Sequence, residues 1–272
     1  MTLPYVMSGA LTGSLPYVRL GRGRETLVIL PGLGDALWDV TTMAQDLALL
    51  YQRFAEQFTV YVISRKRQLP SGYSTRDMAA DCAAAFEKDI GPARVLGISL
   101  GGYIAQHLGA EFPQHVRRLV IACAAHRVSE AGRAIPQRWL TLAREQRWRE
   151  FYFDVAKVTL QEYQQTFYQF LILFLRKRPS DPRDFLVSLE ACRAHNGTDL
   201  LSRISAPTLV IGGTHDMFFP EPLLRETAQR IPDAQLRLLE GTGHGASELR
   251  KNQFERAVID FLREPPLVVQ CR

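Results

Sequence analysis

Two hydrophobic patterns alternate along most of the chain. Short apolar runs are typical of strands covered on both faces, and stretches with apolar residues every three or four positions are typical of helices. The short runs predict strands at 15–20, 26–30, 59–64, 93–96, 119–124, 207–213 and 235–239. Helices are predicted at about 39–54, 75–88, 221–231 and 246–262, and between the turn at 97–101 and residue 112. This alternation predicts a mostly parallel sheet with helices on both faces and a ligand site at the carboxyl ends of the strands.

The alternation is interrupted between residues 126 and 203, where only helical patterns occur. Thr159–Glu162 has the pattern of a helix start, and Asp181–Pro182 that of another. We therefore predict a core of residues 1–125 and 204–264, an inserted helical cap at 126–203 and a loose tail at 265–272.

Composition indicates how large a core the chain can bury and which kinds of segment and site it lacks. The chain has 272 residues, of which 46% are hydrophobic, enough for a large buried core. Its longest strongly apolar run, Phe170–Leu175, is far shorter than the roughly 20 residues that cross a bilayer, and no basic-then-apolar leader is present. The four cysteines are scattered, with no pair or histidine cluster at metal spacing. We expect a cytoplasmic protein with free thiols, no membrane segment and no metal.

The charge is mildly basic. The formal net charge is +5 and the pI is about 9.1. Basic and acidic residues are interspersed and no nucleic-acid motif occurs, so a solvated surface is favoured over nucleic-acid binding. Basic residues outnumber acidic ones between residues 126 and 203, in the predicted cap.

One turn between a predicted strand and a predicted helix has the pattern of a catalytic site. Gly97–Gly101 has the form G-x-S-x-G, and it lies between a predicted strand and a predicted helix. In a nucleophile elbow the small residues at both ends let strand and helix pass closely, and the turn presents the serine at the positive end of the helix. The sequence therefore predicts Ser99 as a nucleophile.

Two later loops offer the groups that a serine nucleophile needs. A serine hydroxyl requires a base, and the base requires an acid that orients it. Asp216 follows one predicted strand and His244 the next, so both should open on the same edge as Ser99. Backbone N–H groups of Leu100 and Leu33 are the candidates for an oxyanion hole, which stabilises the negative charge of the tetrahedral intermediate.

With these residues in place, the chain resembles the α/β-hydrolase superfamily with a helical cap. The resemblance covers essentially the whole chain and is carried by Gly97–Gln106, its continuation to Ala122, and the loops of Asp216 and His244. It implies the α/β-hydrolase fold and a serine hydrolase. Many relatives have a histidine where this chain has Pro31, but the expected donor there is the backbone of Leu33.

Other histidines and aromatic residues are weaker candidates. His126 at a strand end, and Trp139 and Phe167 in the cap, are predicted to contact substrate. His215 is expected to be a surface or supporting residue beside Asp216. His195, near a helix end in the cap, is expected at the surface or interacting with the helix dipole.

The resemblance also narrows the reaction. Relatives that act as dehalogenases or epoxide hydrolases have aspartate at the position of Ser99, and relatives that cleave carbon–carbon bonds commonly have tryptophan at the position of Gly245. We therefore expect hydrolysis of a small-molecule carboxylic ester, without a cofactor, by a monomer or homodimer.

Two alternatives remain open. One is a lactonase or enol-lactone hydrolase acting on an anionic substrate, because the cap is basic and arginine pairs well with carboxylates. The other is an acyltransferase, or a non-catalytic ligand-binding protein with the same fold.

Overall fold

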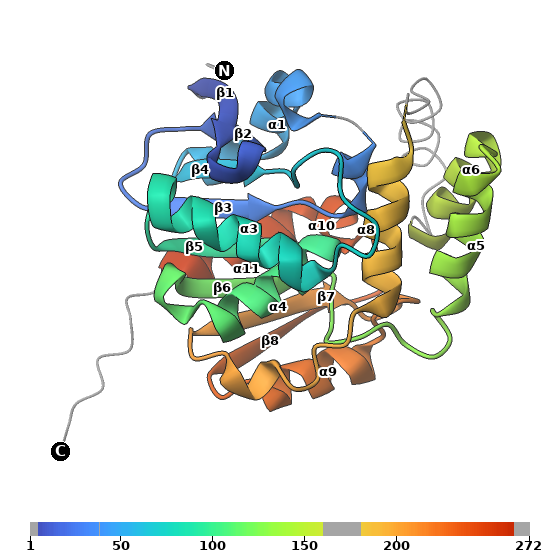
Figure 1. Cartoon of the computed structure of the whole chain (residues 1–272). Helices are drawn as coiled ribbons and strands as arrows, with labels where there is room; N and C mark the ends of the chain where they lie inside the picture. The colour runs from blue at the N-terminus through green and yellow to red at the C-terminus, as the bar shows by residue number, and fades with distance from the viewer. Residues whose placement is uncertain (1–4, 38, 160–180, 264–272) are drawn as a thin grey trace.

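The computed structural model describes residues 5–37, 39–159 and 181–263, and within them the strands form one sheet. Its order is β1-β2-β4-β3-β5-β6-β7-β8 (Figure 1). The strands are β1 Val6–Leu11, β2 Leu15–Leu20, β3 Thr26–Leu30, β4 Thr59–Ile63, β5 Ala93–Ile98, β6 Val116–Ala122, β7 Thr208–Gly213 and β8 Ala234–Leu239. The pairs β1–β2 and β2–β4 are antiparallel, and the other pairs are parallel. This confirms the predicted α/β fold class.

Helices cover both faces of the sheet. They are α1 Ala44–Leu50, α2 Gln52–Ala55, α3 Thr75–Ala85, α4 Leu100–Glu111, α5 Ala134–Arg144, α6 Trp148–Thr159, α8 Arg183–Ala194, α9 Glu221–Arg230, α10 Ala246–Leu249 and α11 Lys251–Arg263. One buried cluster includes residues of α3, α4 and α9, and a second includes residues of α1, α2 and α11. The central strands lie between the two clusters, which is why their sequences are apolar throughout.

The parallel strands end nearly level with one another. Leu30 of β3 pairs with Gly97 of β5, and Ile98 pairs with Ala122 of β6. Ala122 in turn pairs with Ile211 of β7. The loops that follow these strands therefore emerge at one edge of the sheet.

Several predicted boundaries differ from the structure. Strand β1 was not predicted, because Val6–Leu11 shows no alternation and lies mostly exposed at the edge. Strand β6 ends at Ala122 instead of residue 124, because the next residue, Cys123, has a positive φ of 47°. The helix predicted at 39–54 consists of a 3-10 turn at Val40–Met43 followed by α1 and α2, and the last helix is divided at Arg250 into α10 and α11.

Between β6 and β7 the described residues form only helices and loops. Helices α5, α6 and α8 lie together at one end of the sheet (Figure 1). Phe185 of α8 contacts Trp148 and Phe151 of α6 with ring centroids 5.9 and 5.1 Å apart. On the core side, Asp184 of α8 accepts hydrogen bonds from the backbone N–H groups of Gln68 and Leu69 at 3.1 and 2.8 Å. The helix predicted to start at Thr159–Glu162 and the tail at 265–272 lie outside the described residues, apart from Thr159 itself.

Three expectations concern features absent from the described part of the chain. No helix there is long and apolar enough to cross a membrane. Cys82, Cys123 and Cys192 are free thiols, and burial raises the pKa of Cys82 to about 12. In the same residues, no three histidine, cysteine, aspartate or glutamate side chains are grouped so as to hold a metal ion.

The closest packing at the carboxyl edge is between β3 and the start of α4. A Cβ added at Gly101 would lie 1.9 Å from the carbonyl oxygen of Leu30 and 2.9 Å from that of Pro31. We expect Gly101→Ala to lower the free energy of unfolding by about 3 kcal/mol or more, because two backbone segments must separate. Urea unfolding followed by circular dichroism measures this loss.

Gly109→Ala in the same helix is the matched control. Its new Cβ would meet the end of the Leu119 side chain at 3.0 Å, and that side chain can shift. A loss within about 1 kcal/mol is expected. Equal losses in the two variants would contradict the importance of the contact between β3 and α4.

Candidate active site

Ser99 occupies a strained turn between β5 and α4. Its backbone angles are φ 55° and ψ −115°, a region that non-glycine residues rarely adopt. The turn is held by hydrogen bonds from Ser99 N to Ala122 O at 2.9 Å and from Gly102 N to Ser99 O at 2.8 Å. A Cβ at Gly97 would lie 2.3 Å from the carbonyl oxygen of Gly101, so both positions must remain glycine. The geometry is that of a nucleophile elbow.

The structure brings Ser99, His244 and Asp216 into one hydrogen-bonded chain. Ser99 Oγ lies 3.0 Å from His244 Nε2, and His244 Nδ1 lies 2.8 Å from Asp216 Oδ2. The Asp216 side chain is fully buried, and 15% of the His244 side chain is exposed. The second oxygen, Asp216 Oδ1, accepts hydrogen bonds from the backbone N–H groups of Phe218 and Phe219 at 2.8 and 3.2 Å. The carboxylate is therefore fixed on both sides.

The charges around His244 favour its protonated form. Burial disfavours the charged imidazolium, but the negative charge of Asp216 and its hydrogen bond outweigh burial and raise the pKa of His244 above its ordinary 6.5. A proton taken up by this ring is thus stabilised in place, as a general base requires.

Two backbone segments border Ser99 where negative charge would develop. Leu100 is the first residue of α4, so its N–H is one of the unpaired donors at the positive end of that helix. Leu33 is the first residue of the 3-10 turn Leu33–Ala36, which follows β3. A Cβ added at the preceding Gly32 would lie 3.4 Å from Ser99 Cβ and 3.9 Å from Ser99 Oγ. This loop therefore lies directly against the serine.

Aromatic rings line the imidazole. The rings of Phe218 and Phe219 lie 4.8 and 5.6 Å from that of His244, measured between centroids. Trp139 lies 5.5 Å from Phe218, and its Nε1 donates to Asp154 at 2.7 Å. Trp139 is therefore one ring removed from His244. Sequence reasoning overlooked the two phenylalanines, although their place directly after the acid loop indicated them.

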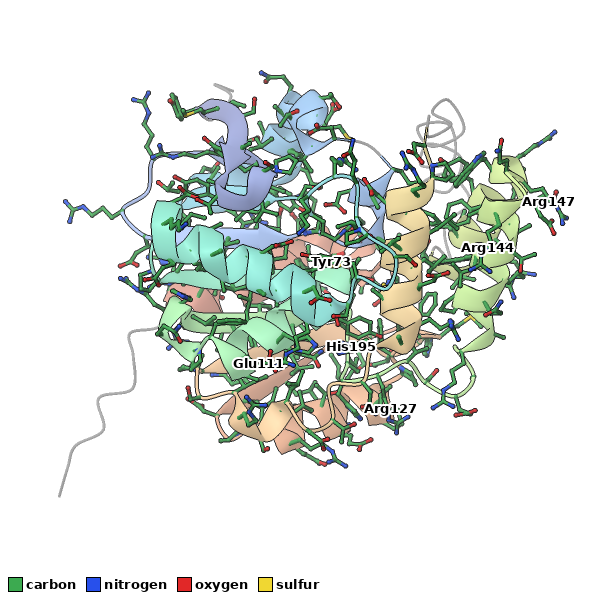
Figure 2. The ribbon with its side chains drawn as sticks, viewed as in Figure 1. Tyr73, Glu111, Arg127, Arg144, Arg147 and His195 are labelled. Carbon is green, nitrogen blue, oxygen red and sulfur yellow. The ribbon has the colours of Figure 1, made fainter. Side chains whose placement is uncertain are left out.

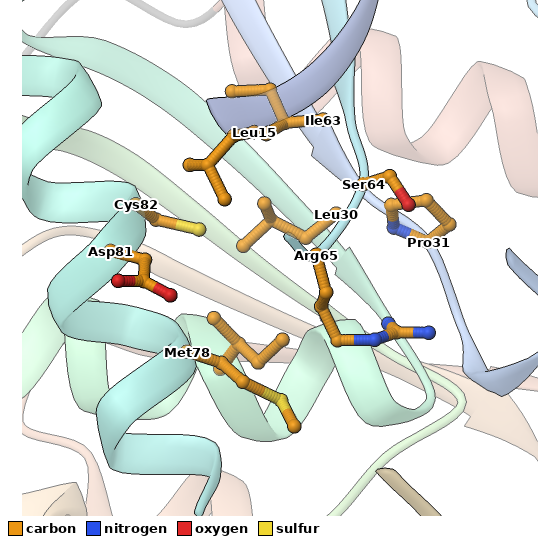
Figure 3. A pocket seen from close by; sticks show the side chains of 10 residues that line it. Leu15, Leu30, Pro31, Ile63, Ser64, Arg65, Met78, Asp81 and Cys82 are labelled. Carbon is orange, nitrogen blue, oxygen red and sulfur yellow. The ribbon is translucent and has the colours of Figure 1, made fainter. Parts of the chain in front are cut away.

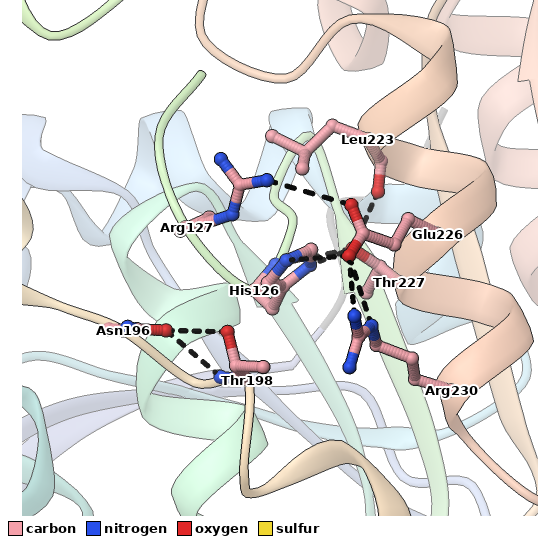
Figure 4. A network of polar contacts seen from close by, with 8 residues as sticks. All are labelled: His126, Arg127, Asn196, Thr198, Leu223, Glu226, Thr227 and Arg230. Atoms are coloured by element: carbon pink, nitrogen blue, oxygen red, sulfur yellow. Dashed lines mark hydrogen bonds and ion pairs between the residues drawn. The ribbon is translucent and has the colours of Figure 1, made fainter. Parts of the chain in front are cut away.

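The structure places His126 away from this chain of hydrogen bonds. The ring is buried against α9, with Nδ1 2.9 Å from Thr227 Oγ1 and Nε2 3.7 Å from Glu226 (Figure 4). Its backbone N–H also donates to Thr227 at 3.2 Å, and its carbonyl accepts from Gly197 N at 2.7 Å. Burial lowers its pKa. These contacts give His126 a structural role in joining β6 to α9.

The remaining predicted residues have separate outcomes. Phe167 lies outside the described residues. His215 is exposed, as expected. His195 is buried, contrary to the expected surface position: its ring stacks on Tyr103 at 3.9 Å, and its Nδ1 lies 3.0 Å from Thr75 Oγ1. Burial lowers the pKa of His195 to about 3, so the ring is neutral and forms part of the core.

Two described arginines of the predicted cap, Arg144 and Arg147, are about half exposed. Figure 2 shows Arg147 at the outer end of α5 and α6, whereas Arg144 reaches from α5 to Glu190 of α8. Arg144 pairs with Glu190 at 2.5 Å, and Arg147 pairs with Glu145 at 2.8 Å and with Glu150. About half of each arginine side chain is exposed. These pairs are typical of a solvated surface.

A comparison with protein families decides the wider relationship. A family model described as "Alpha/beta hydrolase family" matches residues 27–255. The chain belongs to the alpha/beta hydrolase family. The match includes all three members of the hydrogen-bonded chain, and hydrolases are among the relatives.

Individual relatives are distant. The chain is 24% identical to a 2-hydroxy-6-oxononadienedioate/2-hydroxy-6-oxononatrienedioate hydrolase of a Pseudomonas species, with 94% of each protein covered. It is 26% identical to the putative non-heme bromoperoxidase BpoC of Mycobacterium tuberculosis, with 70% of this chain and 76% of the relative covered. The crystal structure of the enol-lactonase from Burkholderia xenovorans LB400 superimposes with a TM-score of 0.77 at 21% identity, covering 95% of this chain and all of the other. That likeness supports the shared fold.

The structural role of His126 is testable through its partner. Thr227→Val keeps the side-chain shape but removes the hydroxyl that bonds the His126 backbone and ring, so we expect the free energy of unfolding to fall by about 1–3 kcal/mol. Thr198→Val is the matched control, because its hydroxyl bonds the exposed Asn196 at 2.7 Å (Figure 4). Chemical denaturation compares the two variants, and equal stabilities would contradict the assignment.

Proposed function

We propose that this protein is a serine hydrolase that cleaves a carboxylic ester of a small molecule through an acyl-enzyme. The observation that carries the proposal is the continuous hydrogen-bonded chain from Ser99 Oγ through His244 to buried Asp216. A hydroxyl, an imidazole and a carboxylate in this order form the constellation that activates serine for acyl transfer. Family membership supports hydrolysis as the reaction class.

In the proposed mechanism each of these residues has its own step. Ser99 attacks the ester carbonyl while His244 Nε2 takes the hydroxyl proton, and Asp216 stabilises the imidazolium that forms. The oxyanion is placed toward the N–H groups of Leu100 and Leu33, each worth about 3 kcal/mol in the transition state. His244 then protonates the leaving alcohol. Water, activated by the same imidazole, attacks the acyl-enzyme and releases Ser99.

The surroundings of His244 favour an apolar group on the substrate. Phe218 is only 5% exposed, and Trp139 behind it is 7% exposed. Both rings are covered mainly by other protein groups, so they make the wall beside His244 apolar and leave only a small edge for a substrate. We therefore propose that part of the ester bound near His244 is apolar.

A lactone or enol lactone that carries an anionic group is the second candidate substrate. Two of the relatives favour it, since one is named for a dioate and another is an enol-lactonase. The arginines described above do not add to this case, because each of them already has an acidic partner at the surface. A panel that pairs neutral esters with lactones and with dicarboxylate monoesters separates the two candidates.

Labelling of Ser99 tests the reaction class. An alkyl fluorophosphonate should modify the wild type at Ser99, and Ser99→Ala should lose both this label and the hydrolysis of short p-nitrophenyl esters. Ser71→Ala, an exposed serine in a loop, should retain both. Mass spectrometry of the labelled peptide identifies the site. A wild type that does not react would favour a binding protein, and labelling without ester hydrolysis would favour acyl transfer.

The pH dependence tests the base. His244 accepts a proton only when neutral, and its pKa is raised above 6.5, so kcat/KM should fall as the pH decreases through a midpoint above 6.5. In Asp216→Asn the stabilising charge is lost, so the midpoint should move to lower pH and the rate should fall on the order of 10³-fold or more. If kcat/KM of Asp216→Asn falls at low pH with the same midpoint as in the wild type, His244 is not the titrating base.

A further inference from the structure

Beneath the loop that carries Leu33 lies a buried ion pair. Asp35 belongs to the same 3-10 turn as Leu33, and Arg65 follows strand β4, the neighbour of β3 in the sheet. The Arg65 guanidinium contacts the Asp35 carboxylate, and the two side chains are only 7% and 4% exposed. Few charged side chains are buried to this extent unless they are paired.

One guanidinium contacts the chain on both sides of Leu33. Arg65 Nη1 and Nη2 each lie 3.4 Å from the carbonyl oxygen of Gly32, the residue before Leu33, and Nη2 also donates to Asp35, two residues after Leu33. Ser64 Oγ donates to the other oxygen of Asp35 at 2.6 Å. The peptide of Leu33 therefore lies between two groups that the guanidinium fixes.

The loop after β3 has few other polar groups that could hold the Leu33 peptide in place. Pro31 has neither an amide hydrogen nor a polar side chain. Arg65 and Pro31 border a small cavity together with Met78 and Cys82, and the guanidinium lies on the Pro31 side of it (Figure 3). Among the described residues, the Arg65 side chain makes its polar contacts with Gly32 and Asp35 alone, while its Nε has no partner.

The cost of burying this pair points to a geometric role. Burial raises the pKa of Asp35, and the opposing effects of Arg65 and Ser64 are smaller. A buried ion pair contributes little net stability compared with apolar residues of the same size, but its hydrogen bonds define one arrangement. The planar fork of arginine can contact a carbonyl and a carboxylate together, which the single ammonium of lysine does not do in the same way.

We propose that Arg65, paired with Asp35, is a positioning residue that holds the Leu33 peptide against Ser99 as one side of the oxyanion hole. The proposal rests on the proposed function. The distance of 3.4 Å from a Cβ at Gly32 to Ser99 Cβ shows how closely this peptide approaches the nucleophile. Loss of the fork lets the peptide move. A shift of about 1 Å at such a site costs roughly 10²-fold in rate.

The decisive variant is Arg65→Lys, which keeps the charge but loses the fork. Arg67→Lys is the matched control, because Arg67 lies in the same loop and contacts the other end of the turn at Ala36 O, 3.4 Å away. The measurements are the second-order rate constant for labelling of Ser99 by an alkyl fluorophosphonate, kcat and KM for an ester that the wild type cleaves, and the melting temperature.

We expect Arg65→Lys to label about 10- to 100-fold more slowly than the wild type, a partial loss of an oxyanion-hole donor. The decrease should lie in kcat with KM unchanged, because the donor acts in the transition state. Arg67→Lys should remain within about twofold of the wild type. A purely structural role for Arg65 would lower the melting temperature of Arg65→Lys and leave its labelling rate unchanged, and this result would overturn the proposal.

A second variant covers the case in which Arg65→Lys does not fold. The double variant Asp35→Leu/Arg65→Met removes both buried charges at once, so no unpaired charge is left behind. It should fold and still label slowly, and a wild-type rate would overturn the proposal. A wild type that is never labelled contradicts the proposed function itself, whereas a labelled wild type with equally fast variants contradicts only the role of Arg65.

Discussion

The backbone of Ser99 is the constraint on which the candidate site depends. Its positive φ is maintained because β5 enters and α4 leaves the turn through contacts that only glycine permits at positions 97 and 101. Strain of this kind costs about 1–3 kcal/mol and persists only when the surrounding structure fixes it. Here the fixing groups are the carbonyl of Ala122 in β6 and the backbone of β3. The serine is therefore presented by the same packing that forms the core.

The parallel sheet accounts for the convergence of residues far apart in the chain. Strands β3, β5, β6 and β7 are paired in a register that brings their carboxyl ends level. Loops after β3, β5, β7 and β8 then supply Leu33, Ser99, Asp216 and His244 respectively. Within this arrangement His244 packs against Phe218, so the acid loop both orients the imidazole and covers it.

The central strands and the three polar members of the site could be predicted from sequence, since each has a local signature. Uninterrupted apolar runs indicate buried strands, and the glycines around Ser99 indicate a strained turn. His126 and His195 could not be placed in this way. Both follow regular elements and carry titratable rings, but their partners Thr227 and Thr75 are 101 and 120 residues away in the chain.

Arg65 and Asp35 show the same limit. Each stands in a polar loop, where charged residues are ordinarily solvated, and neither belongs to a motif. Their pairing depends on the adjacency of β3 and β4, which the order of elements in the chain does not determine. Strand β1 was overlooked for a different reason, since its pairing with β2 depends on main-chain hydrogen bonds and its side chains are largely exposed.

Helix α8 is attached to the strands and helices around the sheet near both of its ends. Asp184 binds the loop at Gln68 and Leu69, a few residues beyond Arg65, and His195 just after the helix is wedged between Thr75 and Tyr103. Both ends of α8 are thus tethered to the core. Helix α6, in contrast, contacts α8 through the rings of Trp148 and Phe151 on Phe185, so α6 can move relative to α8 only by separating these rings.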